Sequence, residues 1–323
     1  MSAFGRPPRL RVSRLAFSAM RLTIAATFAL GSATIVAQDQ PTPLFRTRAD
    51  IVRVDVLATN GGRPIDNLAT DDFELFDNGV RQQAQLASID DLEIDVVLAL
   101  DVSASVRGGL LTTLREAAAA LVGTLRPGDR AAVVTFANAV VIRSPLTTDR
   151  TTMLRALEQV DARGSTSLID AAYATLAMTH GNERPTLVIL FSDGVDTASW
   201  LAPRPVSALA RRSSIVADAI VVANKRLQGE RRRTEAEITQ MPPSDEDIGR
   251  FLVDLTDATG GRIIEGAGGS RLAAAFVDAL KRFRTRYQLT YTPSGVEEAG
   301  YHTIEVRVKK PGATVRARPG YTR

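Results

Sequence analysis

The 323-residue sequence has no cysteine, two histidines and one tryptophan, and aromatic residues make up 5% of it. Without cysteine, the chain has no disulfide bonds, no thiolate zinc or iron–sulfur site and no cysteine nucleophile. The remaining composition, with 45% hydrophobic and 24% charged residues, is typical of a globular protein. A chain of this length has room for one large domain or two modest ones.

Acidic residues are missing from the first 37 positions, which carry five arginines. An uncharged, mostly apolar run of 16 residues follows the last of these arginines and ends at Ala37. A basic start, a short apolar run and small residues at its end are typical of a secretory signal peptide. We therefore expect residues 1–37 to be a leader, either complete or starting at Met20. An uncleaved anchor is the alternative, but the run is shorter than the ~20 residues that span a bilayer.

This leader places the protein in an exported compartment: the periplasm, the extracellular space or the cell surface. We expect no stable membrane span once the leader is cleaved. Residues 1–37 hold five of the 40 Lys and Arg residues and none of the 36 Asp and Glu residues. The mature chain would therefore have 35 basic and 36 acidic residues, so it is nearly neutral. The basic runs at 225–233 and 281–286 are interleaved with other residues and are expected to be solvated faces. The mature chain therefore gives no electrostatic reason to expect nucleic-acid binding.

Two flanking segments have the alternation of half-buried β-strands. In residues 45–90, the stretch 52–56 alternates Val with charged residues, and Asn78-Gly79 is typical of a tight hairpin turn. In residues 286–323, the stretch 304–309 alternates Ile or Val with charged residues. Because neither segment has enough strands to bury a core alone, we expect the two flanks to pair into one small β-sandwich.

Residues 92–283 have a different pattern, in which apolar strands alternate with amphipathic helices. The run 94–100 is continuously apolar except at Asp95, as in a strand buried on both faces. Repeated strand and helix units predict an α/β fold, with a doubly wound, mostly parallel sheet and helices on both faces. The expected strands are 94–100, 131–136, 186–191 and 215–222, and the expected helices are 110–125, 151–160, 168–178, 206–211, 248–259 and 272–283. The polar stretch 224–247 interrupts this pattern, and we expect a disordered segment or surface excursion there, with partner recognition as the alternative.

Oxygen-bearing side chains follow or precede these elements in three places. Asp101, Ser103 and Ser105 come directly after the first buried strand. Thr166 precedes a helix, and Asp193 follows the strand that ends at 191. Because ligands bind at the carboxyl ends of strands in such sheets, we expect these five side chains to converge.

Two carboxylates and three hydroxyls are hard oxygen donors, which suit Mg²⁺ or Mn²⁺ better than Zn²⁺. The two aspartates balance the charge of the metal, so a further position is disposed to accept an anionic oxygen. An Asp or Glu carboxylate from a partner protein is the natural occupant of that position. Alone, the Asp-x-Ser-x-Ser segment would also fit a turn, but its context after a strand favours the metal site.

At these positions the sequence resembles the von Willebrand factor type A domain. The metal-ion-dependent adhesion site of that family has the pattern Asp-x-Ser-x-Ser, then Thr, then Asp, which this chain matches without substitution. The flanks resemble a narrower group of secreted bacterial proteins, called VWFA-related and frequent in acidobacteria, at residues 71–79, 287–293 and 318–321. The resemblance implies a metal-dependent protein-binding or adhesion module, and it assigns no more specific function.

Two other functions remain as alternatives. A metal-dependent hydrolase would need a base beside Ser103 or Ser105, and we expect structural or solvent-facing roles for His180 and His302. A hydrolase of the aspartyl-phosphate type would also need an Asp where this chain has Ser103. We therefore expect no enzyme. The second alternative is a structural protein whose ion only stabilises the fold. Asp196 and Thr197 could line the site, but a turn is the simpler role for them.

Overall fold

A computed structural model describes residues 51–193, 196–222, 245–266 and 268–323. The expected leader at 1–37 and all but the last residues of the polar stretch 224–247 lie outside this part of the chain. Among the described residues, no helix is both long enough and apolar enough to cross a membrane.

A six-stranded sheet forms the centre of the α/β domain. All neighbouring strands are parallel except the last pair, which is antiparallel. Every residue of β6, β9 and β10 is buried, because each of these apolar strands packs on both faces. The strand order is β11 (Ile263–Glu265), β10 (Val216–Val221), β9 (Thr186–Ser192), β6 (Asp95–Asp101), β7 (Arg130–Phe136) and β8 (Val140–Thr147).

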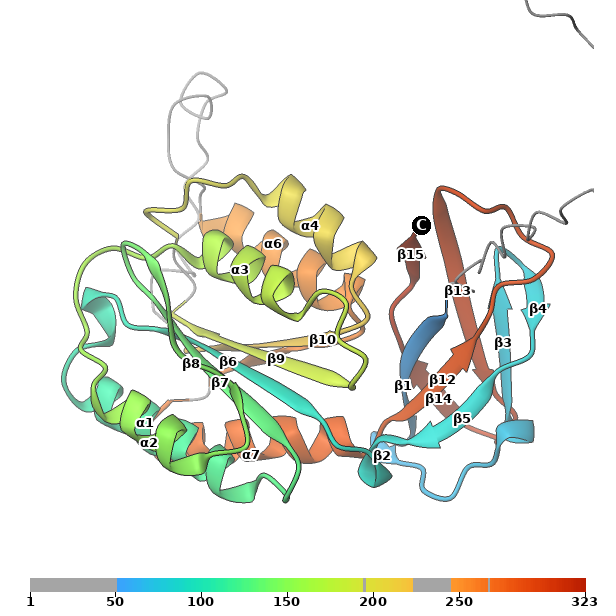
Figure 1. The fold of residues 1–323 in the computed structure, drawn as a ribbon, viewed down its shortest axis with the longest axis horizontal. Helices are drawn as coiled ribbons and strands as arrows, with labels where there is room; N and C mark the ends of the chain where they lie inside the picture. The colour runs from blue at the N-terminus through green and yellow to red at the C-terminus, as the bar shows by residue number, and fades with distance from the viewer. Residues whose placement is uncertain (1–50, 194–195, 223–244, 267) are drawn as a thin grey trace, which may run out of the picture. The chain divides into compact units, whose positions relative to one another are not determined.

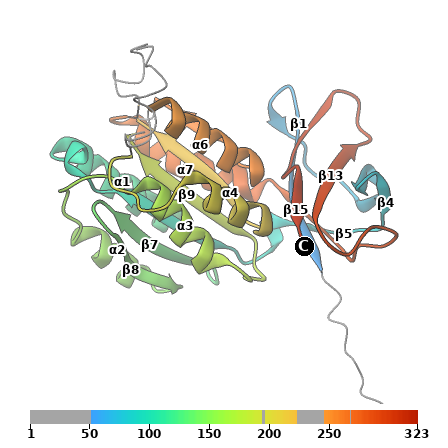
Figure 2. The same ribbon diagram turned by 90° about the horizontal axis from the view of Figure 1, so that it is seen from above.

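Helices cover both faces of this sheet (Figures 1 and 2). One face packs against α1 (Gly109–Thr124), α2 (Arg150–Glu158) and α7 (Arg271–Arg284). The other packs against α3 (Leu168–Thr179), α4 (Pro203–Arg212) and α6 (Asp245–Ala258). Each face has its own apolar core, and Figure 1 shows the helices as one layer on each side of the sheet. The predicted doubly wound α/β fold is confirmed.

The two flanks pair into a second set of sheets around an apolar core of their own. The tight turn predicted at Asn78-Gly79 is present, with positive φ at both residues. The expected small β-sandwich is therefore confirmed, whereas the exact domain boundaries stay predictions. One sheet has the order β14 (Ala313–Arg316), β1 (Val52–Asn60), β12 (Tyr287–Tyr291) and β5 (Gln85–Ser88), with β2 (Arg63–Pro64) paired to β1. The other has the order β15 (Gly320–Thr322), β13 (Tyr301–Val308), β3 (Phe73–Asp77) and β4 (Val80–Gln82).

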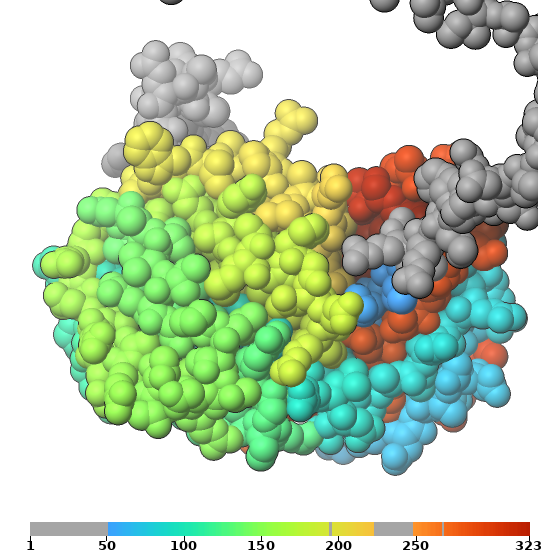
Figure 3. All heavy atoms as spheres, in the orientation of Figure 1, coloured from blue at the N-terminus to red at the C-terminus, as the bar shows by residue number. Residues whose placement is uncertain are grey.

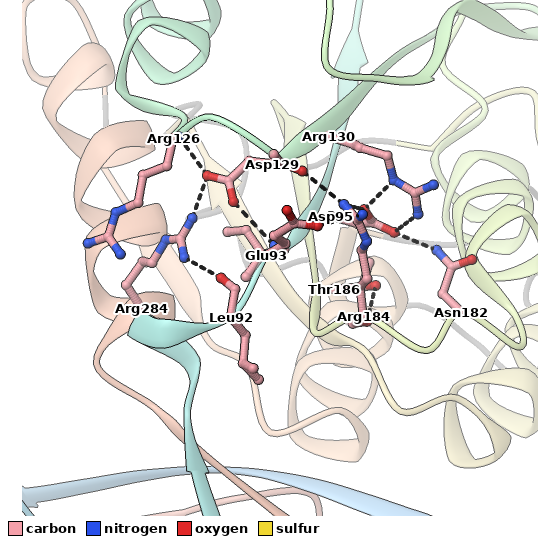
Figure 4. A network of polar contacts seen from close by, with 12 residues as sticks. Leu92, Glu93, Asp95, Arg126, Asp129, Arg130, Asn182, Arg184, Thr186 and Arg284 are labelled. Atoms are coloured by element: carbon pink, nitrogen blue, oxygen red, sulfur yellow. Dashed lines mark hydrogen bonds and ion pairs between the residues drawn. The ribbon is translucent and has the colours of Figure 1, made fainter.

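A buried ion pair holds the amino-terminal edge of the central sheet (Figure 4). The Asp129 carboxylate accepts hydrogen bonds from the backbone N–H of Ile94 at 3.2 Å and of Arg126 at 2.7 Å, and it pairs with the Arg284 guanidinium. Arg284 also donates to the Leu92 carbonyl at 2.8 Å. One carboxylate thus joins the start of β6, the turn before β7 and the end of α7. Beside it, Asp95 is buried and is paired with Arg130 at 2.6 Å.

Glycines end α6 where the chain turns into the sheet. Gly260 has a φ of +70°, and the N–H of Gly261 donates to the Thr256 carbonyl at 2.8 Å, as in a Schellman cap. A Cβ on Gly261 would lie 1.9 Å from the carbonyl oxygen of Ala217 in β10. The close approach of cap and strand therefore requires glycine at 261.

We expect Asp129→Asn to lower the free energy of unfolding by about 3–5 kcal/mol, because it leaves the buried Arg284 guanidinium without its counter-charge. Asp90→Asn is the matched control, since Asp90 pairs with Arg126 in solvent and exposed pairs contribute about 0–1 kcal/mol. Urea unfolding of both variants measures the difference. Equal midpoints for the two variants would contradict a structural role for the Asp129 pair.

We expect Gly261→Ala to destabilise the fold by about 1–3 kcal/mol, because the added methyl group collides with the backbone of β10. Gly123→Ala serves as the control, because Gly123 lies in α1 with no neighbour within 4 Å of an added Cβ. That change removes a flexible helical glycine, so a gain of about 0.5–1 kcal/mol is expected. Thermal melting compares the two, and a neutral Gly261→Ala would show that the cap can move away from β10.

Candidate metal centre

The five predicted ligands lie in three loops at the carboxyl-terminal edge of the central sheet. Asp101 is the last residue of β6, and Ser103 and Ser105 follow it in the turn that includes the 3₁₀ helix at Ala104–Val106. Thr166 precedes α3, and Asp193 comes directly after β9. Because β6 and β9 are parallel neighbours, their ends reach the same edge of the sheet.

The Asp101 carboxylate is fully buried and held at both oxygens. Its Oδ1 accepts a hydrogen bond from the Ser103 N–H at 2.9 Å, and its Oδ2 accepts one from the Ser192 hydroxyl at 3.0 Å. Burial raises the pKa of Asp101 to about 6, against the lowering effect of the Ser103 hydrogen bonds, and the negative charge of Asp193 raises it further. This carboxylate is therefore held in place by two hydrogen bonds, and burial destabilises its charged form.

Backbone hydrogen bonds tie the first loop to the second. The N–H of Ala104 donates to the Gly164 carbonyl at 2.9 Å, and the N–H of Arg163 donates to the Val102 carbonyl at 2.8 Å. The Ser103 and Ser105 hydroxyls lie 2.9 Å apart, within hydrogen-bond distance of each other. The two loops are thus held edge to edge, which fixes both serine hydroxyls relative to the Thr166 loop.

Thr166 joins the second loop to the third. Its N–H donates to the Thr197 hydroxyl at 3.0 Å, and its carbonyl accepts from the N–H groups of Thr197 and Ala198, each at 2.9 Å. Gly164 has a φ of +82°, and a Cβ there would lie 2.5 Å from the Asn138 side chain, which accepts a hydrogen bond from the Ser165 N–H. Glycine is therefore required where the second loop passes Asn138.

Asp193 has the least satisfied carboxylate of the three loops. It is buried, and its Oδ1 has no hydrogen-bond partner among the described residues. A buried, unpaired carboxylate oxygen is costly unless a charge or donor compensates it. Ser192, the residue before Asp193, donates its hydroxyl to Asp101 at 3.0 Å, and β6 and β9 are neighbouring strands, so the two aspartates follow one another along the same edge. Within the described part of the chain, neither carboxylate forms an ion pair with Lys, Arg or His.

The residues after Asp193 have the turn role that we expected. Asp196 accepts hydrogen bonds from the N–H of Ile169 at 2.9 Å and from the Ser199 hydroxyl at 2.6 Å. The first of these bonds satisfies an N–H group in the first turn of α3, as helix capping does. Thr197 holds Thr166 through its hydroxyl, so it positions a predicted ligand. Sequence reasoning missed Asp170, which accepts from the N–H groups of two residues in the same loop.

The two histidines lie away from this edge. His180 is the exposed residue that ends α3. His302 is buried in the β-sandwich, where its Nδ1 lies 2.8 Å from the Asp77 carboxylate and its ring stacks on Tyr321. Tyr321 and Tyr291 also donate to Asp77, each at 2.8 Å. Sequence reasoning did not find this network, because its members come from both flanks and have no local pattern.

The donor set at the edge of the sheet fits a hard cation better than a soft one. No group of three or more His, Asp and Glu side chains within the described part of the chain is placed to hold a metal ion. A cation at this edge would therefore use two carboxylates and neutral hydroxyls, which is the chemistry of Mg²⁺ and Mn²⁺. The Asp193 Oδ1 atom, which has no hydrogen-bond partner among the described residues, would be satisfied by such a cation.

Comparison with known proteins finds one family model that matches part of the central domain. Residues 96–195 match the family model described as the von Willebrand factor type A domain. No curated protein matches the chain.

Several solved structures are similar at low sequence identity. A von Willebrand factor type A protein from Catenulispora acidiphila is 15% identical, with a TM-score of 0.48, and the match covers 80% of this chain and 75% of that one. The conserved hypothetical protein BatB from Bacteroides thetaiotaomicron is 16% identical, with a TM-score of 0.45, and the match covers 59% and 98%. Proximal thread matrix protein 1 of the mussel byssus, with a zinc-occupied adhesion-site motif, is 17% identical, with a TM-score of 0.47, and the match covers 65% and 50%.

The matched segment includes all of β6 except Asp95, the first two loops and Asp193. Both the family model and the doubly wound sheet agree with the resemblance drawn from the Asp-x-Ser-x-Ser segment. Residues 96–195 of this chain are therefore similar to the von Willebrand factor type A domain.

Proposed function

We propose that this chain is an exported protein-binding module that captures an Asp or Glu carboxylate of a partner through Mg²⁺ or Mn²⁺. The observation that carries the proposal is the buried pair of Asp101 and Asp193 at the edge of the sheet, in which Asp193 Oδ1 has no hydrogen-bond partner among the described residues. Asp101, Ser103, Ser105, Thr166 and Asp193 would hold the ion. Export rests on the leader pattern at 1–37, and membership of the VWFA-related group rests on the flanking motifs.

The charges of the proposed site favour an anionic ligand. Two aspartates neutralise a divalent ion without excess, and hydroxyl groups add no charge, so the bound ion would remain a Lewis acid. A partner carboxylate would complete its coordination. The chain's own residues would supply the rest: the Ser103 N–H and the Ser192 hydroxyl hold Asp101 in place. The loop hydrogen bonds to Thr166 hold the second side of the site.

An enzymatic function has less support. Neither histidine lies in the three loops, so Ser103 and Ser105 have no imidazole base, and the carboxylate nearest to them is the proposed ligand Asp101. A purely structural ion would use the same ligands. The experiments below distinguish that role from partner binding.

We expect Mg²⁺ to raise the thermal midpoint of the protein relative to EDTA, and Asp193→Ala to abolish that difference. At an ion concentration 100 times the Kd, binding adds about 2.7 kcal/mol to the free energy of unfolding. Asp161→Ala is the matched control, because Asp161 is an exposed aspartate near the same edge and its loss should preserve the shift. Identical midpoints in Mg²⁺ and EDTA for the wild type would contradict the site.

The binding function is tested by affinity capture from the extracytoplasmic proteins of the source cell, with wild type and Asp193→Ala in parallel. A partner retained in Mg²⁺ and released by EDTA, and absent from the Asp193→Ala sample, is the expected result. Metal-dependent turnover in an activity screen without a partner would favour the hydrolase. A metal-dependent melting shift with neither partner nor turnover would favour a structural ion.

A further inference from the structure

The only tryptophan of the chain is almost completely exposed. Trp200 has 92% of its surface open to solvent. Single exposed apolar residues are ordinary on protein surfaces, but an indole is large and is one of the side chains most enriched where proteins bind each other. Residues 196–212, coloured yellow in Figure 3, form part of the outer surface of the face shown.

The backbone that carries Trp200 is held on both sides. The Asp170 carboxylate accepts from the N–H of Trp200 and from the N–H of Leu201, each at 2.9 Å. Ser199, the preceding residue, is bonded to Asp196 through both its N–H and its hydroxyl. Leu201 packs against the apolar core under α3 and α4. The ring is thus presented by an ordered loop, and pre-ordering of this kind lowers the entropy cost of binding.

Trp200 lies close to the proposed metal centre. The N–H of Ala198 donates to the carbonyl of Thr166 at 2.9 Å. Only one residue separates Ala198 from Trp200, and two residues span at most about 7 Å. The backbone of Trp200 is therefore within about 10 Å of the Thr166 carbonyl, a distance that three residues of an extended chain cover at ~3.3 Å per residue.

The charges around the first two loops favour an acidic ligand. Arg107 follows Ser105 in the first loop and Arg163 precedes Gly164 in the second, and both are exposed. Arg107 donates to the Ala162 carbonyl at 3.1 Å, and neither arginine forms an ion pair with a described residue. Asp161 is the exposed carboxylate of the same stretch. Two arginines that form no ion pair with a described residue, beside a bound cation, would attract carboxylates and repel basic groups.

We propose that Trp200 is a second anchor of the binding face, which packs against an aliphatic or aromatic side chain of the partner. That side chain would lie about three residues from the acidic residue that reaches the metal in an extended segment. This inference rests on the proposed metal-dependent function, and it narrows the partner to an acidic and hydrophobic segment of a protein. The arginines make a basic side chain on the indole face unfavourable, although indoles bind cations in other settings.

The test uses the full-length protein and three synthetic peptides in a Gly-Ser background. The first peptide carries one Glu and, three residues later, one Leu; the second has Ser for Leu, and the third has Gln for Glu. Binding is measured by calorimetry in Mg²⁺ and in EDTA, and by the emission of Trp200, which is the only indole in the chain. The variants are Trp200→Ala, Trp200→Phe and the control Ile142→Ala, which alters an apolar residue of β8 that is 56% exposed.

In Mg²⁺, we expect the wild type to bind the first peptide roughly tenfold more tightly than the second, which is a usual effect of losing an anchor contact. Binding of the first peptide should also shift the emission of Trp200 to shorter wavelengths. Trp200→Ala should bind both peptides equally, Trp200→Phe should keep part of the preference, and Ile142→Ala should keep all of it. Binding of the third peptide should be lost in every case.

The possible failures separate the two proposals. If Trp200→Ala binds the first peptide as tightly as wild type, and EDTA still abolishes binding, the Trp200 anchor is wrong and the metal centre stands. If binding is unaffected by EDTA but is lost in Trp200→Ala, the metal function is wrong. If the first peptide does not bind the wild type in Mg²⁺, the proposal for Trp200 is wrong. The metal centre is then still tested separately, by the difference in thermal midpoint between Mg²⁺ and EDTA.

Discussion

Two negative charges buried at one edge of a sheet are the constraint on which the proposed site depends. Asp101 is held by hydrogen bonds from Ser103 and Ser192, so it has little freedom to turn toward water. The negative charge of Asp193 contributes to the raised pKa of Asp101. The Oδ1 atom of Asp193 has no hydrogen-bond partner among the described residues. Burial of these two carboxylates therefore lowers the free energy of unfolding of the domain. A cation is the simplest compensation, because it would satisfy both carboxylates at once.

The opposite edge of the same sheet has the reverse character. There the buried aspartates are fully paired: Asp129 with Arg284, and Asp95 with Arg130. These contacts fix the starts of the strands and the end of α7, which leaves the carboxyl ends free to carry loops. The fold therefore separates satisfied charges, which hold the domain together, from unsatisfied charges, which are available for a ligand.

Sequence patterns predicted the parts of the molecule that depend on local periodicity or on a short motif. The all-buried β6 and the Asp-x-Ser-x-Ser segment after it are of this kind. The strand β8 was missed because Pro145 and the exposed Arg143 interrupt its apolar pattern, and β11 is too short to show one. The network of Asp77 with His302 joins residues far apart in the chain. The exposure of Trp200 depends on the fold of its loop, and a large apolar residue is expected inside by default.

The pairing of β5 with β12 places the whole α/β domain between two neighbouring strands of one sheet. Ser88 and Tyr287 are partners in this ladder, and the N–H of Ile89 donates to the carbonyl of Arg286 at 3.0 Å. The domain thus occupies the position of a hairpin turn. Closing so long a loop in an unfolded chain is entropically unfavourable and slow, whereas a folded α/β domain already holds its two ends together. We therefore expect a hierarchy of assembly, in which the α/β domain folds first and the sandwich completes itself around the returning chain.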